Sequence, residues 1–329
     1  MKVTEIPPLA PPAIEEKTTI ISSAKMDVTV DENFPRVLSY KWKEDGSILH
    51  GEDEQLFIME VNGEQYIPTV TSTIAEDKSS IIYTMKDFGS TGIELQGKMS
   101  VNDNKLRFEI INVIEPNVKF QTLNIPKQSL ASVKASENGK IASVITTGDW
   151  NNIIEKFSSV QEQTLGVQGK TYGFISNNDF AVSVDSNVTT GGSRISLSTD
   201  NRGADKKTGI GAGAWTYREE LGKADTGANY FQEHKPWIQI AIAKDENNDS
   251  TIDWQDAAIL YRKDMKIPFG GEDIKNNISY VSMNIGYTQN PFLKGLDMVK
   301  NIYNYTDGFG QIVLEKGYQA EGHDDSHPD

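Results

Sequence analysis

Short runs of alternating hydrophobic and polar residues dominate the chain up to about residue 243. The clearest pair flanks the turn sequence Asn102-Asp103-Asn104 and places apolar residues on one period-2 face: Ile93, Leu95, Met99, Val101, Leu106, Phe108 and Ile110. Two such runs around a turn predict an antiparallel hairpin. Similar runs, separated by Gly, Asn and Asp, recur at 56–61, 81–85, 172–175, 180–184, 194–197 and 238–243. Many short strands with few helical segments indicate a large β-sandwich.

The pattern changes near residue 250. Residues 253–265 have helix-like spacing of apolar positions, and the Pro and Gly residues at 268–271 end this helix. Residues 280–285 then predict a strand, Asn290-Pro291 a helix start, and residues 311–314 a second strand. Along the second helix we expect one apolar stripe, formed by Phe292, Leu296, Val299 and Tyr303.

Strand, helix and strand in about forty residues form a βαβ unit, the building block of parallel sheets. A (β/α)8 barrel needs roughly 250 residues, and far fewer follow the sandwich, so we expect a barrel that is incomplete in this chain. The predicted organisation is a linker and first strand at 1–25, a β-sandwich domain at 26–275 and the start of a barrel at 276–329.

The composition of the chain argues against several classes of function. Asp and Glu outnumber Lys and Arg by 47 to 32 in 329 residues, which gives a net charge of -15. A chain this acidic is not expected to bind nucleic acid, whose phosphates require a positive face, or an anionic membrane surface. The absence of cysteine excludes disulfides, thiolate metal sites and cysteine nucleophiles. No run approaches the roughly 18 apolar residues of a membrane helix, so we expect no membrane insertion.

An acidic segment that follows the alternating run at 238–243 has the spacing of a calcium loop. Side-chain oxygens stand at positions 1, 3, 5, 9 and 12, and position 7 supplies a backbone carbonyl; the residues are Asp245, Asn247, Asp249, Asp253, Asp256 and, for the carbonyl, Thr251. Calcium takes about six to eight oxygen ligands. Ser250 replaces the preferred Gly, and Asp256 the preferred Glu. The segment predicts a structural Ca2+ site; the alternative is a solvated turn with Asp253 as a helix N-cap.

Two of the four histidines lie in a second cluster at the end of the chain, formed by His323, Asp324 and His327. It follows the second predicted parallel strand, on the side of the sheet that carries active sites in barrels. Imidazole and carboxylate groups together can bind a metal or sugar hydroxyls. The alternative is a polar chain terminus.

Two weaker patterns allow functional and structural interpretations. Gly209-x-Gly211-x-Gly213 resembles part of a phosphate loop, but no strand–helix context surrounds it, so we expect a flexible loop. Trp215, Tyr217 and Trp237 form either a platform for stacking sugars or ordinary packing, the commoner fate of such aromatics.

Several segments resemble glycoside hydrolase family 101, the endo-α-N-acetylgalactosaminidases: Phe34–Val37, Val61–Gly63, Asp253–Arg262, Gln289–Leu293, Asp307–Gln311 and Gly317–Asp324. The resemblance spans most of residues 26–329, and residues 245–262 are similar to an acidic, calcium-loop-like segment before that family's barrel. It implies a mainly β fold, with a galactose-mutarotase-like β-supersandwich followed by the first βαβ unit of an incomplete (β/α)8 barrel.

The resemblance also implies a retaining hydrolase that releases Gal-β1,3-GalNAc from Ser or Thr of mucin-type O-glycoproteins. In the family, the nucleophile and the acid/base carboxylate lie on later barrel strands, so this chain holds no catalytic counterpart and is expected to be inactive alone. Where the family typically has His-Asp-Ser-Gly-His, this chain has His-Asp-Asp-Ser-His at 323–327, which keeps the Asp-to-His spacing but changes the residues between. The family's Asp and His contact the sugar, so the resemblance places Asp324 and His327, beside His323, against it. The implied location is extracellular or cell-wall attached, and the implied partners are mucin-type glycoproteins.

Two other functions remain open from the sequence. A carbohydrate-binding or surface-adhesion β-sandwich module would need no βαβ unit. A related glycosidase, with the same two domains and another specificity, would differ in carboxylates and aromatics outside this chain.

Overall fold

The computed structural model describes residue 9 and residues 12–13, 15–146, 152–188, 194–201, 203–218, 234–265, 270–274, 276–282 and 292–315. The chain divides into two compact units, Met1–Asp264 and Met265–Asp329. Each unit is considered by itself below.

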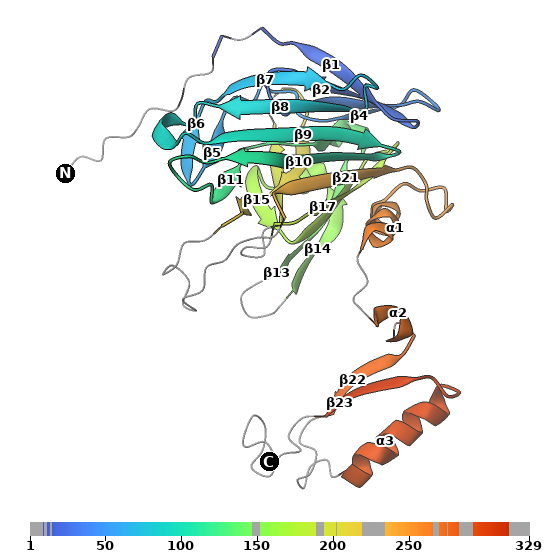
Figure 1. The fold of residues 1–329 in the computed structure, drawn as a ribbon. Helices are drawn as coiled ribbons and strands as arrows, with labels where there is room; N and C mark the ends of the chain where they lie inside the picture. The colour runs from blue at the N-terminus through green and yellow to red at the C-terminus, as the bar shows by residue number, and fades with distance from the viewer. Residues whose placement is uncertain are drawn as a thin grey trace, which may run out of the picture. The chain divides into compact units, whose positions relative to one another are not determined.

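Two large antiparallel sheets dominate the described part of the first unit (Figure 1). One has eight strands, in the spatial order β1 (Thr18–Ser22), β2 (Met26–Asp31), β3 (Val37–Trp42), β4 (Ile48–His50), β12 (Ala131–Lys134), β19 (Lys207–Ala212), β18 (Ile195–Asp200) and β15 (Gly166–Lys170). The other has nine: β14 (Asn152–Ser159), β13 (Lys140–Thr146), β16 (Tyr172–Ser176), β17 (Ala181–Ser186), β21 (Trp237–Ala243), β10 (Lys105–Ile114), β9 (Glu94–Asn102), β8 (Ser80–Lys86) and β7 (Thr69–Ile74).

Smaller elements complete the described part of the first unit. A four-stranded sheet has the order β20 (Trp215–Thr216), β11 (Thr122–Asn124), β5 (Met59–Val61) and β6 (Glu64–Tyr66). Three single-turn 3-10 helices are η1 (Gly89–Thr91), η2 (Ala135–Glu137) and η3 (Val160–Glu162). The predicted mainly β architecture is therefore confirmed.

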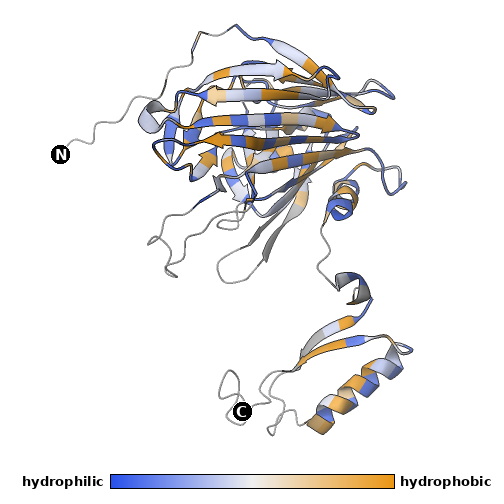
Figure 2. Cartoon of the chain, in the orientation of Figure 1, coloured by the Kyte–Doolittle hydropathy of each residue, from blue (hydrophilic) through white to orange (hydrophobic). Residues whose placement is uncertain are grey.

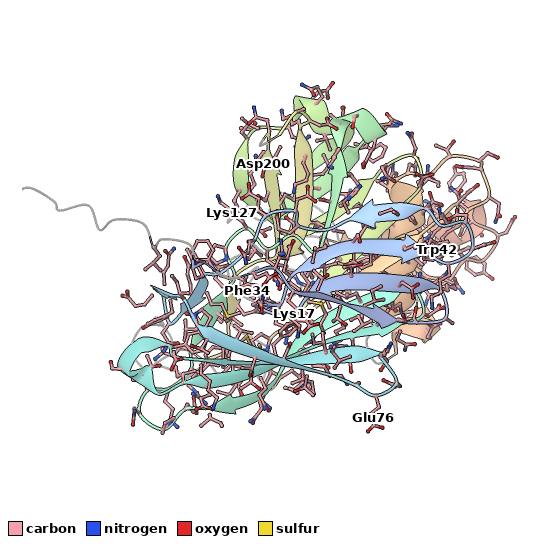
Figure 3. All side chains as sticks on the ribbon, turned by 90° about the horizontal axis from the view of Figure 1, so that it is seen from above. Lys17, Phe34, Trp42, Glu76, Lys127 and Asp200 are labelled. Carbon is pink, nitrogen blue, oxygen red and sulfur yellow. The ribbon has the colours of Figure 1, made fainter. Side chains whose placement is uncertain are left out.

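Alternation along the strands produces the core. In the predicted hairpin, now β9 and β10, the inward side chains from Leu95 to Ile110 are buried, and the outward ones are half-exposed. Gly97 interrupts the apolar row because the ring of Phe108 lies where its Cβ would be, at 2.7 Å. Figure 2 shows the alternation as orange and blue bands along the strands, and Figure 3 shows side chains filling the sandwich from above.

The glycine-rich segment is a strand, so the prediction of a flexible loop was wrong. Gly209 and Gly211 lie in β19, which is buried along its whole length. A Cβ on Gly211 would be 1.9 Å from the backbone oxygen of Gln128, and one on Gly209 would be 2.1 Å from the Oγ of Ser129. Glycine is needed here because segment 128–129 crosses the strand in direct contact.

One helix packs on the outer face of the nine-stranded sheet. Helix α1 (Trp254–Asp264) turns its buried Ala257 and Leu260 toward a floor of small side chains on β17 and β21: Ala181, Ala241 and Ala243. Small side chains allow a helix to lie close to a sheet. This helix corresponds to the one predicted at 253–265.

The second unit contains the predicted βαβ arrangement. After the short helix α2 (Gly271–Ile274), strand β22 (Ile278–Ser282) pairs in parallel with β23 (Gln311–Glu315), and α3 (Phe292–Tyr305) connects them. The helix ends where Asp307 and Gly308 adopt positive φ and the Gly308 N–H donates to the Tyr303 carbonyl, as expected for an Asp-Gly stop.

The predicted stripe on α3 is not its buried face. Of its four residues only Val299 is half-buried; Phe292, Leu296 and Tyr303 are exposed by 55%, 47% and 57%. The buried residue is Gly295. The apolar spacing is present in the sequence, but among the described residues of the second unit these side chains stay largely exposed.

Candidate functional site

The predicted sugar-binding residues His323, Asp324 and His327 lie outside the described residues, which end at Glu315 of β23. They therefore remain predictions. The acidic loop that leads from β21 into α1 is described in full, and its geometry can be compared with the expected calcium site.

The first half of this loop turns around the Asp245 carboxylate. Its two oxygens accept the N–H groups of Asp249, at 3.1 Å, and Ser250, at 2.8 Å. The Asn247 side chain donates to Asp249 at 3.0 Å, so three of the predicted ligands are neighbours. Ser250 has a φ of 67°, the left-handed conformation for which calcium loops use glycine at this position.

The second half uses its carboxylates differently. Asp256 is fully buried, and it accepts the N–H groups of Glu246 at 2.7 Å, Asn247 at 3.3 Å and Asp253 at 2.9 Å. Asp253 accepts the Gln255 N–H at 2.7 Å, the contact expected of a helix N-cap. Asp256 thus closes the loop onto the start of α1 through the backbone.

The hydrogen bonds of these side chains determine how well the loop could hold a calcium ion. The part of the chain that the structure describes contains no group of three or more His, Cys, Asp or Glu side chains placed to hold a metal. Asp245, Asn247 and Asp249, together with the Thr251 carbonyl, have the sequence spacing of calcium ligands. The carboxylates of Asp245, Asp249, Asp253 and Asp256 all accept backbone N–H groups instead. Calcium binding stays a prediction for this loop.

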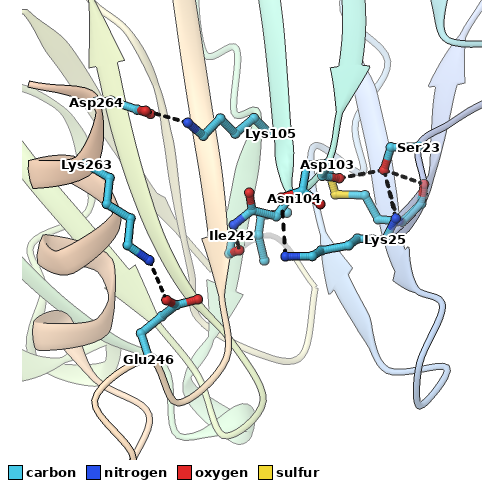
Figure 4. Close-up of polar contacts among 10 residues, drawn as sticks. Ser23, Lys25, Asp103, Asn104, Lys105, Ile242, Glu246, Lys263 and Asp264 are labelled. Carbon is cyan, nitrogen blue, oxygen red and sulfur yellow. Dashed lines mark hydrogen bonds and ion pairs between the residues drawn. The ribbon is translucent and has the colours of Figure 1, made fainter.

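Ion pairs hold α1 and the loop to the sheet (Figure 4). Lys263 pairs with Glu246 of the loop at 2.8 Å. The last residue of the helix, Asp264, pairs with Lys105 of β10 and accepts the Gln239 side chain of β21 at 3.1 Å. The chain therefore leaves the first unit from a fixed point above these two strands.

Buried charges inside the sandwich are matched by partners in the same unit. Arg36 and Asp31, both almost fully buried, form an ion pair of 2.9 Å, and burial raises the pKa of Asp31 although Arg36 acts to lower it. Lys207 of β19 lies 3.3 Å from Glu52. Such satisfied pairs indicate a structural role, because a reactive group would need access to a ligand.

The aromatic platform predicted as one possibility does not form. Trp215 and Tyr217 are buried in the core, where Tyr217 packs on Phe120. Trp237 alone remains half-exposed, and the guanidinium of Arg107 lies 4.2 Å from its ring centroid. No local pattern predicts this contact, because β10 and β21 are distant in the chain and only the sheet order brings them together.

Comparisons with known proteins identify both parts of the chain. The family described as "Galactose mutarotase-like fold domain" matches residues 21–254. The chain belongs to this family. Residues 255–329 match the family described as "Endo-alpha-N-acetylgalactosaminidase", which confirms the resemblance to glycoside hydrolase family 101.

A curated relative shares both segments. A protein of Renibacterium salmoninarum, named as a candidate endo-alpha-N-acetylgalactosaminidase, is 30% identical over 331 residues, which cover 94% of this chain. The match spans 21% of the relative's length, so the chain corresponds to about a fifth of that protein.

Several solved structures resemble this chain at low sequence identity. Alpha-N-acetylgalactosaminidase NagBb from Bifidobacterium bifidum, solved as a quadruple mutant, has a TM-score of 0.49 and 10% identity, over 94% of this chain and 53% of its own. A candidate aldose 1-epimerase of Escherichia coli K12 has a TM-score of 0.43 and 6% identity, over 70% of this chain and 100% of its own.

No described helix is long and apolar enough to cross a membrane.

Proposed function

We propose that this chain is part of a retaining endo-α-N-acetylgalactosaminidase that releases Gal-β1,3-GalNAc from Ser or Thr of mucin-type O-glycoproteins outside the cell. One observation carries the proposal: a mutarotase-like domain and an endo-α-N-acetylgalactosaminidase segment follow each other in the order also covered by the curated relative.

The geometry of the second unit supports incorporation into a larger parallel sheet. Parallel strands are normally buried on both faces by helices, and here a single parallel pair is accompanied by α3. Exposed apolar side chains on the helix, including Leu293 at 76%, would gain cover from further βα units. We infer that 276–329 form the start of a (β/α)8 barrel.

Within that barrel, Asp324 and His327, with His323 beside them, are proposed to hold the sugar. They follow β23, and active sites of such barrels lie at the carboxyl ends of the strands. A carboxylate accepts hydrogen bonds from sugar hydroxyls, and an imidazole can donate or accept one. The nucleophile and acid/base are proposed to come from later strands.

Two measurements test this function. The 329-residue chain should not release disaccharide from a core-1 aryl glycoside, because it lacks both carboxylates; release would overturn their assignment to later strands. In the full-length protein of which this chain is part, Asp324→Ala should lower kcat/KM by about 100-fold or more, whereas an exposed control, Asp297→Ala on α3, should leave it unchanged. An unchanged kcat/KM in Asp324→Ala would remove this residue from the site.

Calcium is proposed as a structural ion of the 245–256 loop. Spacing supports it, as does the positive φ of Ser250. At a calcium concentration 100-fold above Kd, a bound ion should add about 2.7 kcal/mol to the free energy of unfolding, and chelation should remove it. Asp245→Asn should abolish calcium binding in isothermal titration and the calcium-dependent rise of the thermal unfolding midpoint. Asp77→Asn, in a distant turn, should retain both. Equal thermal midpoints with calcium and with chelator would identify the loop as a plain turn.

A further inference from the structure

One patch on the outer face of the nine-stranded sheet holds an arginine for which no hydrogen bond is found among the described residues. It comprises two adjacent outward positions on each of three neighbouring strands, β9, β10 and β21 (Figure 1). Ser100, Arg107 and Gln239 form one row across the strands, and Lys98, Glu109 and Trp237 form the next. All six side chains are half-exposed, while the residues between them point into the core. We call these six residues the Arg107 patch.

Arg107 is held in place without hydrogen bonds. Its guanidinium lies over the Trp237 ring, 4.2 Å from the centroid, and stacking of this kind fixes the plane of the group. Its Nε is buried and has no hydrogen-bond partner, and the Glu109 carboxylate oxygen is 3.6 Å from it, so the exposed part of the guanidinium is the part that a ligand can reach. No hydrogen bond to its other nitrogens is found in the described part of the chain.

The other arginines packed into the first unit behave differently. Arg36 donates to Asp31, Arg194 to Asp185 and Arg218 to Glu115, so each guanidinium has its acceptor within the chain. The patch residue therefore combines a fixed orientation with unused donors. A planar guanidinium in this state is prepared for a carboxylate, which can accept two parallel N–H···O bonds.

The neighbours of Arg107 favour an anion on a polar ligand. Lys98 lies diagonally across from it and makes no ion pair within 4.0 Å among the described residues. Of the nearby carboxylates, Asp264 is bound by Lys105 and Gln239, and Asp185 by Arg194, so the carboxylate left facing Arg107 and Lys98 is that of Glu109. The Ser100 hydroxyl, opposite Arg107, has no hydrogen-bond partner in the described region. Hydroxyl, carboxylate and amide groups around one aromatic ring suit a sugar, which has both hydroxyls and apolar C–H surfaces.

We propose that the Arg107 patch binds a sugar that carries a carboxylate, such as a sialic or uronic acid, with Arg107 gripping the carboxylate and Ser100 and Glu109 bonding hydroxyls. The choice of a saccharide rests on the proposed function, because the chain belongs with sugar-cleaving proteins. Strand spacings make the patch about 10 Å by 7 Å, enough for one sugar residue. The net charge of -15 opposes unspecific attraction of polyanions, so recognition depends on local contacts.

Isothermal titration of the 329-residue chain tests this site without any hydrolysis. The probes are sialyllactose, its neutral counterpart lactose, and a galacturonate disaccharide, which separates sialic from uronic acids. We expect at least one acidic probe to bind and lactose not to bind. Arg107→Ala should weaken binding at least about tenfold, and Lys98→Ala by less, whereas Arg262→Ala, an exposed arginine of α1, should have no effect.

Arg107→Lys is the control for misfolding of Arg107→Ala, since it keeps a cation over Trp237 but lacks the planar fork. It should retain the urea unfolding midpoint and still bind several-fold more weakly. Equal binding of lactose and sialyllactose, absence of binding by both acidic probes, or full affinity in folded Arg107→Lys and Arg107→Ala would overturn the proposal. Sialyllactose contains no α-linked GalNAc, so these outcomes are separate from the hydrolase test.

Discussion

The two units of this chain differ in how far they bury their apolar side chains. In the sandwich, inward side chains on both large sheets meet in one continuous core, and β10 and β21 bury Leu106, Phe108 and Ile240 almost completely. In the second unit, by contrast, exposed large apolar residues are concentrated among the described residues: Met265, Ile274, Phe292, Leu293, Leu296, Met298, Tyr303, Tyr305, Phe309 and Leu314. The described part of the first unit therefore buries its apolar side chains in its own core, whereas the described part of the second leaves many of them exposed.

Loss of a core side chain should have the largest effect on the free energy of unfolding, and this effect should differ between the two units. Ile240→Ala in β21 should lower the free energy of unfolding by about 2–5 kcal/mol, because the residue is fully buried between the sheets. Leu296→Ala in α3 should change it by about 0.5 kcal/mol or less, because half of this side chain is exposed and alanine favours helix. Urea unfolding of both variants measures the difference. Similar losses would show that the second unit has a packed core of its own.

Independent unfolding of the two units is the second expected effect. All five Trp residues lie in residues 1–264, so their fluorescence reports on the first unit alone. Far-UV circular dichroism includes α3 as well. We expect part of the helical signal to be lost at a lower urea concentration than the fluorescence change. Coincident transitions by both probes would instead indicate one cooperative structure.

The smallest expected effect is electrostatic and belongs to the first unit. Burial acts to raise the pKa of Glu115, but Arg218, the Phe120 N–H and Lys119 outweigh it and lower this pKa from 4.5 to about 2. A depressed carboxyl pKa adds stability above the unfolded value, and that stability is lost as pH falls from about 4.5 to about 2.

Glu115→Gln should therefore make the urea midpoint less dependent on pH in this window. A matched control is Glu94→Gln, whose carboxylate pairs with Lys86 on the outer face of the sheet. If both variants follow the wild-type pH profile, the Glu115–Arg218 pair contributes nothing measurable to the sandwich.

Local patterns predicted the elements better than their arrangement. The alternation from Leu95 to Ile110 identified a hairpin whose register follows it, except for the bulge between Ile110 and Asn112. The same alternation contained no information on why β12 lies between β4 and β19, because partner choice among distant strands depends on the whole core. Glycines at 209 and 211 were misread for that reason: the segment that crosses them is remote in sequence.

The candidate sites show a similar limit. Spacing alone identified the 245–256 loop, but it could not distinguish a carboxylate that binds a cation from one that accepts backbone amides, as Asp256 does. Arg107 and Trp237 had no signal at all, since their contact exists only because β10 pairs with β21. The resemblance to glycoside hydrolase family 101 supplied what neither periodicity nor spacing could, namely an expectation of the chemical class.

Helix α1 has a practical consequence for dividing this chain. The endo-α-N-acetylgalactosaminidase family segment starts at residue 255, yet the helix that opens it packs on Ala181, Ala241 and Ala243 of the mutarotase-like domain and is fastened there by Asp264. A polypeptide cut at the family boundary would expose that alanine floor and leave Lys105 without its carboxylate. The family match assigns α1 to the glycosidase segment and packing assigns it to the sandwich, so the family boundary and the structural boundary do not coincide.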